Sequence, residues 1–169
     1  MSLPRYAPGR AFPPYAYLPG RDPHPTRDEA GHSYSAGAEP PPLPLPPERW
    51  RENEPYLFGV DLYNHGYLWE AHEAWEELWH PAKGDALPAD YLQGLIQCAA
   101  AALKILMGQP RGLERLAEQG TARLERVARA AGPVYMGLDL PPFIAAFRAF
   151  ASSAPSDAGE RPLIELELE

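Results

Sequence analysis

Apolar side chains recur every three to four positions from Glu48 onward, the spacing that places them on one face of a helix. Glycine or proline ends each such stretch, at Gly66, Pro81, Gly108 and Gly132. We expect helices between these breaks, over about 48–66, 67–80, 88–108 and 110–132, and a short fifth helix after Asp139. The pattern predicts an all-α fold, a bundle-like domain of four to five helices.

The two ends of the chain follow different patterns. Thirteen of the 22 prolines precede residue 48, and proline at this density is incompatible with helix and with central strand. The segment also carries five aromatic side chains, whereas disordered tails are usually poor in them. We therefore expect residues 1–47 to form an extended arm on the domain or on a neighbouring subunit. Alternating Leu and Glu at the other end predict a short extended tail over 153–169, which leaves 48–152 as the helical domain.

Composition narrows the classes of partner. The net charge is -8, and the arm is neutral, so the helical part and the tail carry all of it. Such acidity argues against binding to nucleic acid or to an anionic membrane surface. No apolar run is long enough for a membrane span, and we find no secretory signal pattern at the start of the sequence. The single cysteine, Cys98, can form neither an internal disulfide nor a thiolate zinc cluster. These features predict a cytoplasmic protein.

The stretch from 67 to 79 is the most unusual part of the chain. It holds four carboxylates, one histidine and three tryptophans in about three and a half helical turns. Between Pro55 and His80 there are five acids and three histidines but neither Lys nor Arg. A solvated helix face usually mixes both signs of charge, so this bias calls for an outside cation or for bases from another element.

Helical spacing puts His72, Glu73 and Glu76 on one patch of this stretch. The order resembles the His-Glu-x-x-His helix of metallopeptidases with Glu in place of the second His. His72 and Glu76 would then be metal ligands, and Glu73 the general base. Imidazole with carboxylate suits zinc, manganese or iron. A third ligand would have to come from one more side chain: Asp61, His65, His80 or a residue of a different helix.

A structural interpretation competes with the metal site. The third predicted helix carries Gln93, Gln97 and Lys104 on a face away from its leucines. Buried amides need partners, and carboxylates of the acidic helix would supply them, with Lys104 as the counterion in place of a metal. Glu70 points further round than Glu73 and is expected to be exposed or to face a partner. The sequence thus predicts a Glu–His–Gln–Lys network, with or without a metal.

Several motifs together resemble the bacterial and archaeal family catalogued as domain of unknown function 309. The resemblance covers roughly residues 50 to 150 and rests on three groups of residues: Tyr63, Asn64, Gly66, Tyr67, Glu70, His72, Glu73, Trp75, Glu76 and Trp79; Leu92, Gln93, Gly94, Leu95, Ile96, Gln97, Ala99 and Ala100; and Gly137, Leu138 and Asp139. It implies a small all-helical fold, a homodimer and the family label of predicted metal-dependent hydrolase. The family's characteristic polar residues fall here on Glu70, His72, Glu73, Glu76 and Gln97.

Two functions from different classes follow. The first is a metal-dependent hydrolase with ligands His72 and Glu76, base Glu73, and Gln97 orienting a carboxylate or a substrate group. The second is a non-catalytic homo-oligomeric helical module in which the Glu–His–Gln cluster is a structural polar core.

Overall fold

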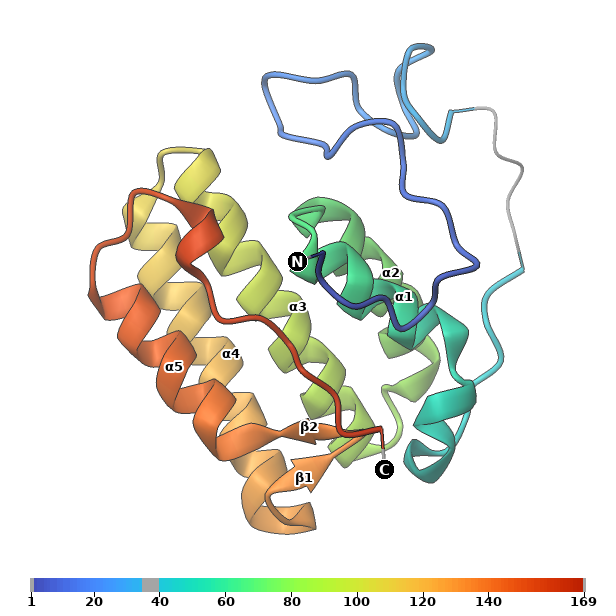
Figure 1. Ribbon diagram of the computed structural model, residues 1–169, viewed down its shortest axis with the longest axis vertical. Helices are drawn as coiled ribbons and strands as arrows, with labels where there is room; N and C mark the ends of the chain where they lie inside the picture. Colours follow the sequence, from blue (N-terminus) through green and yellow to red (C-terminus); the bar gives the residue numbers. More distant parts are fainter. Residues whose placement is uncertain (1, 35–39, 169) are drawn as a thin grey trace.

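A computed structural model describes residues 2–34 and 40–168 of the protein; Met1, Glu169 and residues 35–39 of the predicted arm and tail lie outside the described residues. Five α-helices form its body (Figure 1): α1 (Glu54–Asn64), α2 (Leu68–Ala82), α3 (Ala86–Leu106), α4 (Pro110–Ala131) and α5 (Leu140–Ser152). The central helix α3 packs against α2 and α4, which in turn pack against α1 and α5. The all-α bundle-like fold expected from the sequence is confirmed.

Short elements complete the architecture and correct two predicted boundaries. They are the 3-10 helices η1 (Pro47–Glu52) and η2 (Ala158–Glu160) and the antiparallel strands β1 (Val134–Tyr135) and β2 (Leu138–Asp139). The single helix predicted over 48–66 is therefore wrong. It is divided at Asn53, whose side chain accepts a hydrogen bond from the Tyr56 amide and so starts α1 afresh. Helix α2 also continues one residue past Pro81 instead of ending before it.

Helices α3 and α4 approach each other closely at two glycines. A Cβ atom on Gly120 would lie 2.9 Å from the carbonyl oxygen of Gly94 and 3.2 Å from the amide nitrogen of Cys98. On the other side, a Cβ atom on Gly94 would lie 2.8 Å from Cγ of Leu124. Because backbone atoms cannot turn aside as a side chain can, these glycines fix the spacing of the two helices.

Gly120→Ala should lower the free energy of unfolding by about 1–3 kcal/mol, since α3 and α4 must move apart to admit the methyl group. Gly112→Ala on the same helix is the matched control. Its Cβ atom would meet the flexible Lys104 side chain at 3.0 Å, and alanine is the better helix former by about 1 kcal/mol. Urea denaturation measures both variants, and equal stabilities would contradict the close approach.

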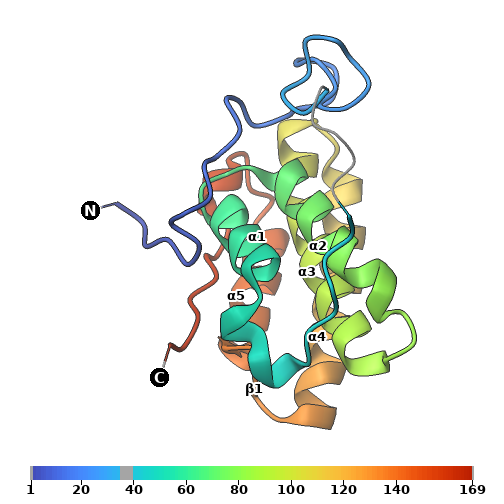
Figure 2. The same ribbon diagram turned by 90° about the vertical axis from the view of Figure 1, so that its right-hand side faces the viewer.

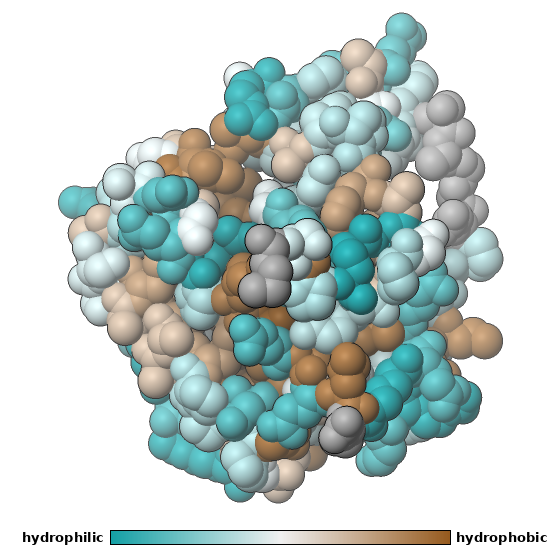
Figure 3. Space-filling view, in the orientation of Figure 1, coloured by the Kyte–Doolittle hydropathy of each residue, from teal (hydrophilic) through white to brown (hydrophobic). Residues whose placement is uncertain are grey.

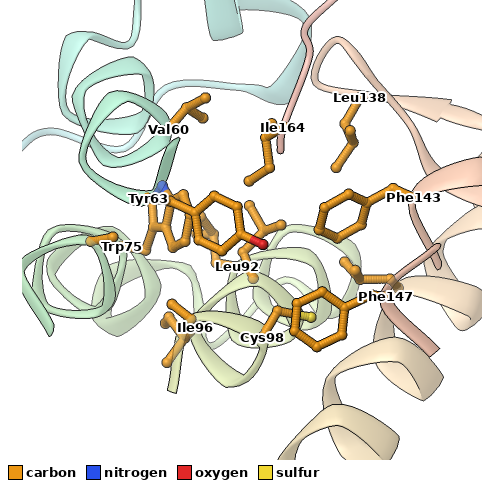
Figure 4. Close-up of a cluster of buried hydrophobic side chains, with 14 of the residues drawn as sticks. Val60, Tyr63, Trp75, Leu92, Ile96, Cys98, Leu138, Phe143, Phe147 and Ile164 are labelled. Carbon is orange, nitrogen blue, oxygen red and sulfur yellow. The ribbon is translucent and has the colours of Figure 1, made fainter. Parts of the chain in front are cut away.

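Aromatic side chains from α1, α2 and α5 pack together in the interior, next to α3. Figure 4 shows Tyr63 of α1 and Trp75 of α2 in one cluster with Phe143 and Phe147 of α5, and all four are buried. Their polar atoms are satisfied: the Tyr63 hydroxyl donates to the carbonyl of Pro162, and the Trp75 indole to the carbonyl of Tyr56. At Tyr63 and Trp75 the core thus combines buried apolar area with satisfied hydrogen bonds.

The N-terminal arm lies on its own domain, along α1 and α2 (Figures 1 and 2). Its first anchor is Asp61 of α1, which has no exposed surface. The Asp61 carboxylate accepts hydrogen bonds from Arg5 Nε at 2.9 Å and from the amides of Tyr6 and Ala7 at 2.7 and 2.9 Å. Further along the arm, Phe12 stacks on Tyr67 at 4.9 Å between ring centroids.

The C-terminal tail, expected to be extended over 153–169, begins with η2 and is extended only after it, where it closes the bundle between α1 and the hairpin. Asn64 exchanges two hydrogen bonds with the backbone of Ile164, and Leu166 forms an antiparallel bridge with Leu138. The buried Arg161 donates to the carbonyls of Tyr63 and Asn64 at the end of α1. A cation is favoured at a helix C-terminus, so Arg161 fastens the tail to α1.

On the outer surface, hydrophobic residues appear in patches separated by hydrophilic side chains (Figure 3). Among the described residues, no helix combines the length and the apolar character that crossing a membrane requires.

Cys98 is buried inside α3, and burial raises the pKa of its thiol far above the usual range.

Candidate metal centre on the second helix

Helix α2 has one buried and one open face. Its buried side chains include Leu68, Ala71, Trp75 and Leu78, spaced three or four residues apart. Gly66, with φ of +88°, ends α1 and lets the chain turn into α2. This register turns the residues between the apolar positions outward, His72 and Glu76 among them.

The predicted trio of His72, Glu73 and Glu76 does converge. His72 Nδ1 lies 3.3 Å from Glu73 Oε1, and His72 Nε2 lies 3.4 Å from Glu76 Oε2. One ligand atom from each of the three residues can be chosen so that all lie within 4.8 Å of one another. Their side chains are 28%, 45% and 35% exposed, so the trio lies at the surface and is accessible to ions.

His80 is the only one of the three named candidates for a third ligand that the structure brings near. Its Nε2 atom lies 3.7 Å from Glu76 Oε1, and His80 is about two helical turns beyond His72. Asp61 is instead occupied by the arm, and His65 packs against the Phe12 ring at the end of α1. The described structure thus offers two imidazoles flanking one carboxylate.

The donor set fits a transition-metal ion. Zinc bonds of about 2.0–2.1 Å in a tetrahedron place neighbouring ligand atoms about 3.3–3.4 Å apart, which is the separation of His72 Nε2 and Glu76 Oε2. The second ring nitrogen of His72 faces Glu73, and a carboxylate in that position commonly fixes the tautomer of a metal-binding histidine.

Glu70 was expected to be exposed or to face a partner, and of these alternatives exposure is wrong. Only 6% of it is accessible, because the arm covers it. The Tyr17 amide donates to both carboxylate oxygens at 2.9 and 3.2 Å, and His32 Nε2 lies 3.7 Å from Oε2. Burial raises the pKa of Glu70 to about 7 and lowers the pKa of His32.

The expected pairing with α2 carboxylates is wrong for Gln97 and for Lys104. Gln97 donates to Gln119 and accepts from Arg123 Nε at 3.1 Å, and both partners are on α4. Lys104 donates to Gln109 at 2.8 Å, just before α4. Gln93 is half-buried on the same helix. Gln97 and Lys104 therefore lie on the side of α3 that faces α4, where Leu124 packs against Gly94.

Sequence reasoning missed the arm residues that bind the α2 region. Tyr17 and His24 pack edge-on against Trp69 at 5.0 and 5.6 Å, and His32 packs on Tyr15 at 4.8 Å. The only signal was the richness of the arm in aromatic residues. It indicated docking but not which carboxylates the arm would bind.

A comparison with family models found a match that includes the trio. Residues 56–116 match the domain of unknown function 309 (DUF309), a segment that runs from α1 into the first turns of α4. This segment is similar to DUF309 domains. It contains the trio on α2, whereas the arm, α5 and the tail lie outside the match. No curated protein and no solved structure matches the chain. A match to a domain of unknown function defines no activity.

Proposed function

We propose that this protein is a metal-dependent hydrolase that holds one divalent ion on the exposed face of α2. Zinc is the first candidate for this ion. The observation that carries the proposal is the 3.4 Å separation of His72 Nε2 and Glu76 Oε2 on a surface that solvent reaches. His72 and Glu76 would hold the ion, and the His80 ring, which lies outside the converging group, would have to turn toward them to supply a third ligand. When bound, such an ion supplies a Lewis acid and makes its bound water more acidic.

Glu73 takes a different role from the one its sequence position suggests. Its carboxylate lies beside Nδ1 of His72, so it would keep the Nδ1 proton in place and direct the Nε2 lone pair toward the metal. This contact favours a positioning role for Glu73 over that of general base. Because its side chain is 45% exposed, it also remains able to contact a substrate.

The exposure of the trio disfavours the non-catalytic alternative. A structural polar core would be buried and would satisfy its own hydrogen bonds. In this protein Asp61 and Glu70 have that character, because the arm covers both of them. The trio on α2 instead keeps its carboxylates accessible at the surface.

Elemental analysis of tag-free protein, loaded with zinc and then desalted, tests the metal site. We expect about one zinc per chain in the wild type and none in Glu76→Gln, which keeps the shape of the side chain but loses the charge. Glu77→Gln, one position along α2, should retain the metal. Glu73→Gln should bind it about 10–100-fold more weakly, as substitutions of such positioning carboxylates do.

The hydrolase part is tested separately with a panel of chromogenic esters and phosphoesters. The zinc-loaded wild type should hydrolyse at least one of them, and Glu76→Gln should not. Zinc binding without hydrolysis would leave a metal-binding module and contradict the enzyme. Absence of zinc from the wild type would contradict both and favour the non-catalytic module, whose oligomeric state light scattering would then measure.

A further inference from the structure

A hollow of about 470 Å³ lies at the end of the fold that carries η1 and the β1–β2 hairpin. It is formed by η1, the start of α3, the last residue of α4 and the β1–β2 hairpin. Figures 1 and 2 show η1 and the hairpin together at this end of the molecule. The volume is in the range of small-molecule sites.

The lining combines apolar surface with unpaired negative charge. Trp50, Leu87 and Met136 contribute apolar walls, and Glu48 and Asp85 contribute carboxylates. Across residues 2–34 and 40–168, neither carboxylate forms a salt bridge or a side-chain hydrogen bond. Asp85 precedes α3 without capping it, so the local fold does not use its charge.

One lining residue carries a buried hydroxyl without a partner among the described residues. Tyr135 lines the hollow and is 8% exposed, and its hydroxyl is buried without a hydrogen-bond partner in the described structure. Such groups are rare in folded proteins and call for an explanation by a bound molecule or water. Burial, and then the negative charges of Asp85 and Glu48, raise the pKa of Tyr135 to about 12. The two carboxylates are therefore close enough to influence the Tyr135 hydroxyl electrostatically.

The hairpin holds Tyr135 in this position. Its two-residue turn places Met136 at φ +46° and Gly137 at φ +81°, the combination that a tight hairpin of two antiparallel strands requires. The Tyr56 hydroxyl donates to the Met136 carbonyl at 2.9 Å and so fixes the turn. The Tyr135 ring packs edge-on against Tyr91 at 4.9 Å. The aromatic wall of the hollow is therefore built into the fold and does not depend on a ligand.

We propose that this hollow binds a small organic cation, a primary ammonium with an apolar body. Glu48 and Asp85 would pair with the ammonium, an apolar body would lie against Trp50 and Leu87, and the Tyr135 hydroxyl would gain a partner. An inorganic divalent ion fits less well, because apolar and aromatic walls supply no ligands to a hard cation. Aromatic walls with carboxylates are instead the chemistry that recognises organic ammonium groups.

Isothermal titration calorimetry of the full chain, with chelator present so that the α2 site is empty, tests the proposal. The probes are 2-phenylethylammonium, the neutral 2-phenylethanol and the anionic phenylacetate. The ammonium should bind about tenfold or more tightly than the alcohol, and phenylacetate should bind least. Equal affinity for ammonium and alcohol, or no heat from the ammonium at millimolar concentrations, would overturn the proposal.

Three variants locate the site. Asp85→Asn and Glu48→Gln should each weaken ammonium binding several-fold, whereas Glu167→Gln, an acid outside this hollow, should leave it unchanged. Tyr135→Phe should also weaken binding without lowering the melting temperature, because the hydroxyl makes no hydrogen bond that the variant could lose. If the carboxylate variants bind the ammonium as the wild type does, the cation lies elsewhere and the assignment is wrong.

Discussion

Asp61→Ala should lower the free energy of unfolding by about 3–5 kcal/mol and release the arm. The fully buried carboxylate binds the Arg5 guanidinium and the amides of Tyr6 and Ala7. Alanine would leave all three donors without an acceptor, so the arm would have to leave α1 for these donors to reach water. Urea denaturation measures the stability, and limited trypsin digestion at Arg10 and Arg21 measures the release.

Two further variants sharpen this prediction. Asp61→Asn keeps one acceptor oxygen without the charge and should fall between wild type and alanine. Glu54→Gln on the same helix should change stability by less than about 0.5 kcal/mol, because its side chain is 61% exposed and lies 3.7 Å from Arg10. An Asp61→Ala protein with wild-type stability and a protected arm would disprove the anchor.

Glu70→Gln should stabilise the protein increasingly as the pH rises from 4.5 to 8. The pKa of Glu70 is about 7 in the fold, above its ordinary value of 4.5, so the folded state holds the proton more tightly than the unfolded state. The resulting contribution is complete below pH 4.5 and is lost as the pH rises through 7. Gln keeps an acceptor for the Tyr17 amide and does not ionise, so its advantage should reach about 3 kcal/mol at pH 8.

Thermal unfolding from pH 5 to 8 checks this difference. The two curves should converge near pH 5 and separate above it. The pKa of His32 is lowered, so its protonation at acid pH opposes folding, and this effect should appear in both proteins. A Glu70→Gln protein less stable than wild type at pH 8 would show that the ionised carboxylate holds the arm.

Local patterns in the sequence were sufficient for the helices and for the trio. Residues four apart on a helix are neighbours whatever surrounds them, so the proximity of His72 and Glu76 followed from spacing alone. The hairpin was missed because its strands have two residues each and Met136 occupies a turn position where Asn, Asp or Gly is usual.

The faces of the helices could not be assigned in the same way. Glu70 is buried by an arm whose contact lies 53 residues earlier in the chain, and Gln97 is turned by Arg123, which is 26 residues later. Neither contact has a periodic signature, because each depends on which helix occupies the neighbouring position in the bundle. Gln97 faces α4 because Leu124 of α4 packs against Gly94, and this packing cannot be read from the sequence.

The acidic side chains between Pro55 and His80, on α1 and α2, fall into two groups with different roles. Asp61 and Glu70 meet the arm, which provides Arg5, backbone amides and His32. His72, Glu73 and Glu76 meet no Lys or Arg side chain in the described structure and remain accessible. The first group holds the arm, and the second group is the one we assign to a metal ion.

Anomalous diffraction at the zinc edge, from crystals of zinc-soaked protein, tests this division most directly. Our account predicts one strong peak about 2.0–2.2 Å from His72 Nε2 and from a carboxylate oxygen of Glu76, with Asp61 and Glu70 still bound to the arm. No peak at the trio, or zinc bound at Asp61 or Glu70 with the arm displaced, would contradict it.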